Sequence, residues 1–249
     1  MGRNKIVESL GIAAALLAGV ACSDSAGPDD TGAVIVRVSG AAGMSFVAEL
    51  LTLDVPGSIG VLTIDAIHLI VDEFKLERVE DACEDLNGDD DACENFEAPP
   101  FFVAVPLDGD DIGIVSQAIP ADTYEELKFE TKAPEDDGSL LAEIRLQFDD
   151  WPEDASAHVI GTFTPDVGEP VPFRVFFDAE VKVELEFDPP FEVVEGEDQA
   201  VTVFVDPAIW FANPDGSVVD LSTFDFDETG EVVKLEVKFE NGFTKVEVD

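Results

Sequence analysis

The residues with the clearest capacity for chemistry are acidic and lie in one segment. From Glu80 to Glu97 the chain carries nine carboxylates and no basic residue. Oxygen-bearing side chains occupy alternate positions within this segment, at Asp85, Asn87, Asp89 and Asp91. Calcium loops use this spacing because alternate residues can turn toward one cation. The pattern therefore predicts a calcium site at these four residues.

The same segment also fits an alternative, a solvated acidic loop that holds no metal. Position 6 of the match is Asp90 rather than glycine, and position 12 is Phe96 rather than glutamate. Glu94 and Glu97 lie close enough along the chain to supply the missing carboxylate. Long loops inside compact domains are typically functional or disordered. Both interpretations, calcium and solvation, stay open at this stage.

Three cysteines occur in the chain. Cys22 ends an apolar run near the N-terminus, whereas Cys83 and Cys93 flank the predicted calcium ligands. In an exported protein, an even pair of cysteines is typical of a disulfide. We therefore predict a disulfide between Cys83 and Cys93.

The N-terminus has the pattern of a secretory signal. Arg3 and Lys5 precede an apolar run that ends at Ala21 and is shorter than the ~20 residues of a membrane-spanning helix. The run ends in GVAC, which resembles a bacterial lipobox. The resemblance implies cleavage before Cys22, diacylation of its sulfur and, because Ser23 follows, the outer membrane. Glycine stands where the lipobox usually has leucine, so ordinary signal-peptidase cleavage is the alternative.

The charge balance excludes one class of partner. There are 56 acidic and 13 basic residues, for a formal net charge of −43. Such a surface repels nucleic acid, so we predict no nucleic-acid partner. Solvation in a salty habitat and the binding of divalent ions both fit the acidity. The hydrophobic fraction of 46% is enough for a folded core.

Catalytic motifs are missing from the sequence, and we predict that the protein is not an enzyme. The only histidines are His68 and His158, and His68 is expected on the surface of a strand, opposite Ile67 and Leu69. A second partial calcium match runs from Asp225 to Gly230 with Glu236 at position 12, where an ordinary acidic turn is favoured. The aromatic residues considered for sugar binding are Tyr124, Trp151 and Trp210, and the turn before Tyr124 is typical of a tyrosine corner.

Apolar residues alternate with a period of two along most of the chain after the signal, which predicts an all-β protein. About a dozen short strands separated by turns indicate an antiparallel β-sandwich. We expect a signal-peptide helix over residues 1–21, a flexible tether over 22–32 and the sandwich over 33–249, with a sub-boundary near 133–138. The predicted strands include residues 33–39, 101–105, 113–118, 126–131, 139–148, 158–164, 171–177, 180–187 and 200–205. Residues 61–79 are expected to form two strands or one strand bent near Asp72-Glu73.

Two local patterns near the C-terminus are more specific. Asp206-Pro207 predicts the start of a helical turn over Ala208 to Ala212. Asn241-Gly242 between alternating runs predicts a hairpin that pairs Phe239 with Thr244. Pro189-Pro190 is expected to end a strand.

Three segments resemble a group of uncharacterised bacterial lipoproteins with an immunoglobulin-like or transthyretin-like sandwich. They are AIHLIVDEFKLERV, FVAVPL followed by IPADTYEELKF, and the strands from Val171 to Val205. Asp122 stands where that group has glycine in its turn. The resemblance implies one sandwich domain through about residue 211, and no settled activity.

Together these patterns predict a lipid-anchored protein of the cell envelope with a binding or structural role, stabilised by calcium. Its expected partners are the membrane, through the anchor, and an envelope protein or glycan. The alternative is a surface lipoprotein that binds or hydrolyses polysaccharide.

Overall fold

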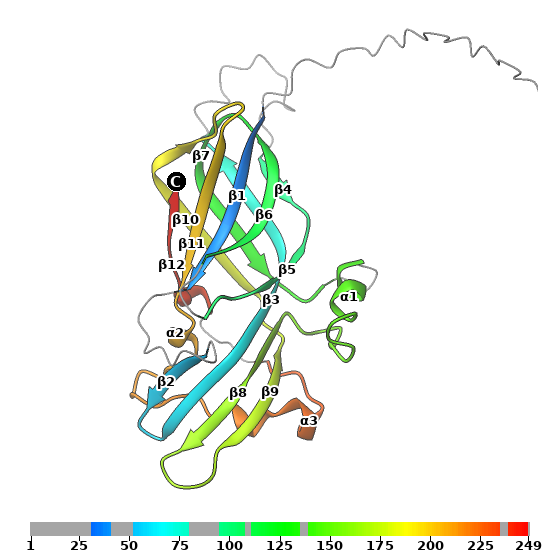
Figure 1. Cartoon of the computed structure of the whole chain (residues 1–249), viewed down its shortest axis with the longest axis vertical. Coiled ribbons are helices and arrows are strands. Elements are labelled where there is room, and N and C mark those ends of the chain that lie inside the picture. The colour runs from blue at the N-terminus through cyan, green and yellow to red at the C-terminus, as the bar shows by residue number, and fades with distance from the viewer. Residues whose placement is uncertain are drawn as a thin grey trace, which may run out of the picture.

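A computed structural model describes residues 31–40, 52–79, 95–107, 111–134, 139–234 and 239–248. The all-β sandwich predicted from the sequence is confirmed (Figure 1). None of the helices in these residues is both long and apolar enough to cross a bilayer.

Two sheets form the sandwich. The smaller sheet has the order β12-β11-β1-β6, from β1 (Thr31–Gly40), β6 (Asp111–Pro120), β11 (Asp198–Val205) and β12 (Phe243–Val248). Its β1–β11 pair is parallel, and its other pairs are antiparallel. The eight-stranded sheet has the order β10-β7-β3-β8-β9, with three short strands also paired to β3. Its strands are β2 (Leu53–Gly57), β3 (Gly60–Arg78), β4 (Phe96–Ala98), β5 (Phe101–Ala104), β7 (Thr123–Thr131), β8 (Ala157–Pro165), β9 (Val171–Phe177) and β10 (Val181–Glu192).

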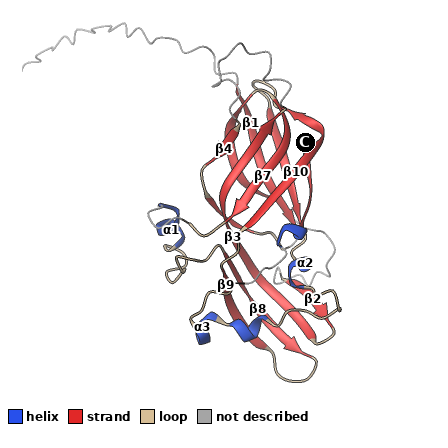
Figure 2. Ribbon diagram, turned by 180° about the vertical axis from the view of Figure 1, so that it is seen from behind, coloured by secondary structure: helices blue, strands red, loops and turns tan. Residues whose placement is uncertain are grey.

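Strand β3 is central to the larger sheet because it is long enough to pair with two groups of strands. Its C-terminal half pairs with β7 and its N-terminal half pairs with β8 (Figures 1 and 2). The register shifts between Val71 and Glu73, so β3 is the single bent strand that the sequence allowed. Alternation along β3 sends Leu62, Ile64, Leu69 and Phe74 into the main core.

The opposite face of β3 is covered by a second apolar cluster. Its buried members are Ile70, Leu141, Ile144, Trp151, Ala155 and Phe176. The cover comes from α1 (Ser139–Ile144) and the turns that follow it, where the sequence predicted a strand. That prediction is wrong because Leu141, Ile144 and Phe148 recur at intervals of three and four, which is the spacing of one helix face.

Tyr124 forms the predicted corner. Its side chain is fully buried and its hydroxyl donates to the carbonyl of Pro120 at 2.9 Å. Asp122, which departs from the resembled turn, forms an ion pair with Arg78 at 3.1 Å and accepts from the backbone N–H of Thr123. The aspartate therefore ties this turn to the end of β3.

The predicted C-terminal hairpin is wrong. Residues Phe239–Gly242 form a short 3-10 helix (η4), and β12 pairs with β11, placing Val246 opposite Val203. The backbone N–H of Asp206 donates to the carbonyl of Gly242 at 2.8 Å, and a Cβ at position 242 would lie 1.8 Å from Nε1 of Trp210. Close packing against the indole, rather than a two-residue turn, explains the glycine.

Other local predictions have mixed outcomes. β9 has the predicted bounds, and the helical turn is α2 (Ala208–Phe211), with Asp206 accepting from the N–H of Ala208. β10 continues past Pro189-Pro190 to Glu192 through an irregularity, so the prolines do not end it. The end of the predicted acidic loop is β4, which pairs with β3. The remaining short helices are η3 (Leu221–Phe224) and α3 (Phe226–Thr229).

Replacing Gly242 by alanine is expected to destabilise the fold by about 1–3 kcal/mol, because the new methyl group overpacks against Trp210. Urea unfolding followed by tryptophan fluorescence measures this free energy. A midpoint equal to that of the unchanged protein would show that the indole can move aside without cost.

Candidate metal centre

The two histidines of the chain lie opposite each other on neighbouring strands. His68 of β3 pairs directly with His158 of β8 in the antiparallel register. Their ring centroids are 5.5 Å apart and their planes are inclined by 21°. Both rings project from the face of the sheet that carries the second apolar cluster, because Ile67, Leu69 and Val159 point into the main core.

The pair is the centre of a row of four rings across four strands. Phe102 of β5 stacks on His68 with a centroid distance of 5.4 Å, and Phe176 of β9 stacks on His158 at 4.3 Å. In both contacts the planes are inclined by 10°. Cross-strand neighbours on one face of a sheet have this proximity by geometry. The strands of the sheet therefore set the spacing of the two imidazoles.

Phe148 and Trp151 cover the row from outside the sheet. Phe148 lies 4.8 Å from His68 and 5.5 Å from His158 between centroids, and Trp151 meets His158 edge-on at 5.5 Å. The indole N–H of Trp151 donates to the carbonyl of Ala155 at 3.0 Å, which fixes the ring over the site. The prediction that His68 lies on the strand surface is wrong, because the segment after α1 folds over that face.

The imidazoles have little hydrogen bonding in this environment. His158 is 1% exposed, and neither of its ring nitrogens has a partner; Nδ1 of His68 is also buried without one. Burial lowers the pKa of His68 to about 4. Burial, followed by the charges of His68 and Arg174, lowers the pKa of His158 to about 3. Both rings are therefore neutral at pH 7, and in each ring one nitrogen carries a proton while the other has a free lone pair.

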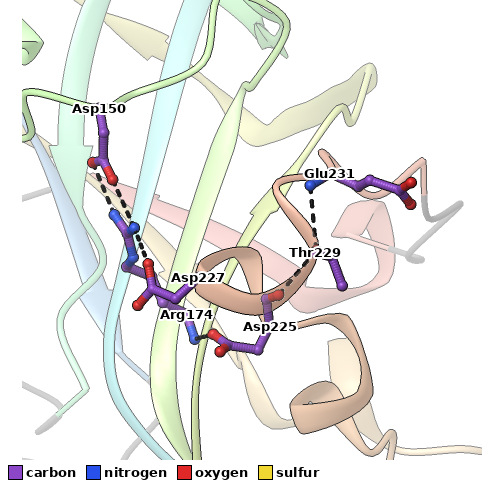
Figure 3. Close-up of polar contacts among 6 residues, drawn as sticks. All are labelled: Asp150, Arg174, Asp225, Asp227, Thr229 and Glu231. Carbon is purple, nitrogen blue, oxygen red and sulfur yellow. Dashed lines mark hydrogen bonds and ion pairs between the residues drawn. The ribbon is translucent and has the colours of Figure 1, made fainter.

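Arg174 of β9 joins the turn that follows α1 to the segment of α3 (Figure 3). Its guanidinium binds both oxygens of Asp150 at 2.8 and 2.6 Å and also pairs with Asp227 of α3. Its backbone N–H donates to Asp225 at 2.8 Å. The guanidinium also lies 5.4 Å from the ring centroids of Phe176 and Phe226.

These contacts shift the charges beside His158. The hydrogen bond and charge of Arg174 lower the pKa of Asp150, and the two carboxylates raise the pKa of Arg174. Three carboxylates, those of Asp150, Asp225 and Asp227, therefore surround one guanidinium, which leaves a local excess of negative formal charge. The segment with the second partial calcium match, Asp225 to Gly230, thus contains a short helix. Its carboxylates Asp225 and Asp227 bind Arg174, and Glu236 lies outside the described residues.

Replacing Arg174 by methionine is expected to destabilise the protein by about 1–2 kcal/mol, because two partly exposed ion pairs and two cation–π contacts are lost together. Urea unfolding at low and high salt measures the loss, which should shrink as salt screens the pairs. Lys182→Met is the matched control: Lys182 is 75% exposed in its pair with Glu130, so solvent screens that pair and its loss should cost less. Equal losses in the two variants would contradict the assigned role of Arg174.

The other predicted site residues divide into two groups. Cys22, Cys83, Cys93 and the calcium ligands Asp85, Asn87, Asp89 and Asp91 lie outside the described residues. The aromatic residues considered for sugar binding are all buried: Tyr124, Trp151 and Trp210 are 0%, 1% and 4% exposed. None of these three rings offers a face to a sugar.

Sequence reasoning missed the histidine pair because the register between β3 and β8 is not a local property. One signal that could have found the pair is the alternation along each strand: both histidines alternate with core residues, so both belong to the outer face. The helical spacing over residues 139–148 was the other signal, since it indicates a cover for that face.

No protein-family model and no curated protein sequence matches the chain. Among solved structures, the chain is similar to MbnP from Methylosinus trichosporium, with 13% identity and a TM-score of 0.37. The similarity covers 70% of this chain and 76% of that one.

Proposed function

We propose that this protein is a lipid-anchored binding protein of the cell envelope that holds one monovalent copper ion between His68 and His158. The observation that carries the proposal is the pair of facing, neutral imidazoles, in which three buried ring nitrogens have no partner. A buried polar atom without a hydrogen bond costs about 1–3 kcal/mol, and a bound ion would remove that cost for one nitrogen of each ring.

The spacing of the rings suits a shared ion. An imidazole nitrogen lies ~2.0–2.1 Å from a bound metal, so two rings on one ion have centroids about 5–6 Å apart. The observed separation of 5.5 Å falls in this range, and the near-parallel rings would have to turn so that one nitrogen of each points at the ion. A bound ion would then cross-link β3 and β8 at the centre of the sheet.

The donor set favours copper. Imidazole suits zinc, copper, nickel and iron. Structural zinc sites take four protein ligands. Among the residues that the structure describes, no group of three or more His, Cys, Asp or Glu side chains is placed to hold a metal. Two neutral nitrogens match the low coordination number that monovalent copper accepts.

The surrounding charge favours a cation. The carboxylates of Asp150, Asp225 and Asp227 outnumber the one guanidinium of Arg174 beside His158.

Copper titration of the metal-free protein tests the proposal. Under reducing, oxygen-free conditions, competition against bicinchoninate should show one monovalent copper ion bound per chain, and monovalent silver should displace it. Zinc at the same concentration should not compete. Absence of a one-to-one copper complex would overturn the proposed function.

The anchor at Cys22 and the calcium loop are separate parts of the proposal. They rest on the lipobox resemblance and on the spacing of the acidic residues. Labelled palmitate should enter the protein in cells and should be lost in Cys22→Ala; label that persists in the variant would contradict the anchor. We propose binding rather than catalysis for the whole chain.

A further inference from the structure

A groove lies at the edge of the sandwich where the two sheets separate. β10 leaves its register with β7 between Glu186 and Phe191, around Pro189-Pro190. β12 of the smaller sheet lies beside β10 at this edge (Figure 1). The space between them is a groove of about 470 Å³, which is within the ~300–1,000 Å³ of typical ligand pockets.

The floor of the groove is apolar. Phe187 and Phe191 lie in it with ring centroids 5.6 Å apart, facing Val246 and Val248 of β12. Both phenylalanines are buried, but Val248 is 40% exposed. Val248 pairs with the core residue Val201, so its exposed side chain marks a place where the core side of the smaller sheet is uncovered.

β12 also supplies unpaired backbone groups. It is the end strand of the smaller sheet, and in the described part of the chain it pairs with β11 alone. An edge strand presents a row of N–H and C=O groups that can pair with another extended chain. In β-strand addition these groups give affinity, and pockets for alternate side chains give specificity.

The rim of the groove is acidic, which favours a positively charged ligand. Asp188, Glu192 and Glu247 line it, and all three are exposed. Lys245 pairs with Glu247 but does not line the groove. A second copy of this chain would carry the same net charge of −43, so pairing between two β12 edges is opposed by repulsion.

We propose that the groove binds an extended, lysine-rich segment of a partner protein, which adds to β12 as a further strand. Alternate apolar side chains of the segment would lie on the phenylalanine floor, and its lysines would meet the three rim carboxylates. None of the residues that line the groove belongs to the histidine pair or its cover, and the proposal does not depend on metal binding.

The probe is a short blocked peptide of alternating lysine and valine, followed by fluorescence anisotropy with the purified full chain. Asp188→Lys/Glu192→Lys should weaken binding by about tenfold or more. The control Asp166→Lys/Glu169→Lys changes the net charge equally at the exposed connection between β8 and β9, and should change affinity by less than about twofold. Equal losses in the two variants would mean unspecific attraction and overturn the proposal.

Backbone methylation of the peptide tests the strand pairing itself. Two versions carry N-methyl groups on the lysines only or on the valines only, which blocks the donors of one edge each. Strand addition uses one edge, so one version should lose binding and the other should keep it. Equal binding of both versions, or no measurable binding of the parent peptide, would overturn the proposal.

Discussion

Replacing His158 by phenylalanine should lower the affinity for monovalent copper by at least about 100-fold. Loss of an outer-shell partner alone typically costs 10–100-fold in metal affinity, and here one of two direct ligands is removed. Phenylalanine keeps a ring against Phe176, so the stacked row across the strands is preserved. His68→Phe should have a similar effect, and competition against bicinchoninate measures both.

Phe148→Leu is the control for this result. It alters the cover of both histidines but leaves their nitrogens in place, so copper affinity should fall by much less. If the His68→Phe/His158→Phe double variant bound copper as tightly as the unchanged protein, the ion would bind elsewhere and the histidine site would be refuted.

The histidine pair should also make folding stability sensitive to mild acid. The folded pKa values of His68 and His158, about 4 and about 3, lie below the ordinary value of 6.5. As pH falls below 6.5, both histidines bind protons in the unfolded chain but stay neutral in the folded chain. Each histidine then removes about 1.4 kcal/mol of stability per pH unit, down to its folded pKa. The stabilisation is complete above pH 6.5 and is lost toward pH 4.

The test uses metal-free protein and a variant that lacks both histidines. The variant is needed because protonation of carboxylates also changes the stability in acid, and that change must be subtracted. Relative to the His68→Phe/His158→Phe variant, the unchanged protein should lose about 2–4 kcal/mol in the free energy of unfolding between pH 7 and pH 5. Urea unfolding at both pH values gives the difference. Parallel pH profiles of the two proteins would show that the imidazoles gain protons in the folded state as easily as in the unfolded chain.

Unlike folding stability, the affinity for copper should change little over the same pH range. Protons compete with a metal only near the pKa of the ligand. With folded pKa values of about 4 and about 3, the affinity at pH 5 should remain within about twofold of the affinity at pH 7. A steep loss near pH 6.5 would mean that the rings are more solvated than the structure has them.

Much of the secondary structure follows from the sequence because alternation is a local property. The period of two predicts the sandwich, the exact bounds of β9 and the bend in β3 near Asp72, and it places His68 opposite Ile67 and Leu69. The corner at Tyr124 and the turn of α2 follow from equally local patterns.

Tertiary structure decided what those local patterns could not. Asn241-Gly242 has the composition of a hairpin turn, but the packing of Gly242 on Trp210 and the pairing of β12 with β11 override it. The segment over residues 139–148 has helical spacing as well as apolar residues, and only its placement over the outer face of β3 shows which property matters.

The candidate site depends most strongly on tertiary structure. The sequence by itself placed His68 opposite Ile67 and Leu69, on the face of its strand that was expected to be exposed. The strand register then placed His158 opposite His68, because pairing between distant strands is set by how the whole core packs. Burial of the pair by Phe148 and Trp151 lowers the pKa values of the imidazoles, and that environment exists only when the α1 segment folds over the sheet.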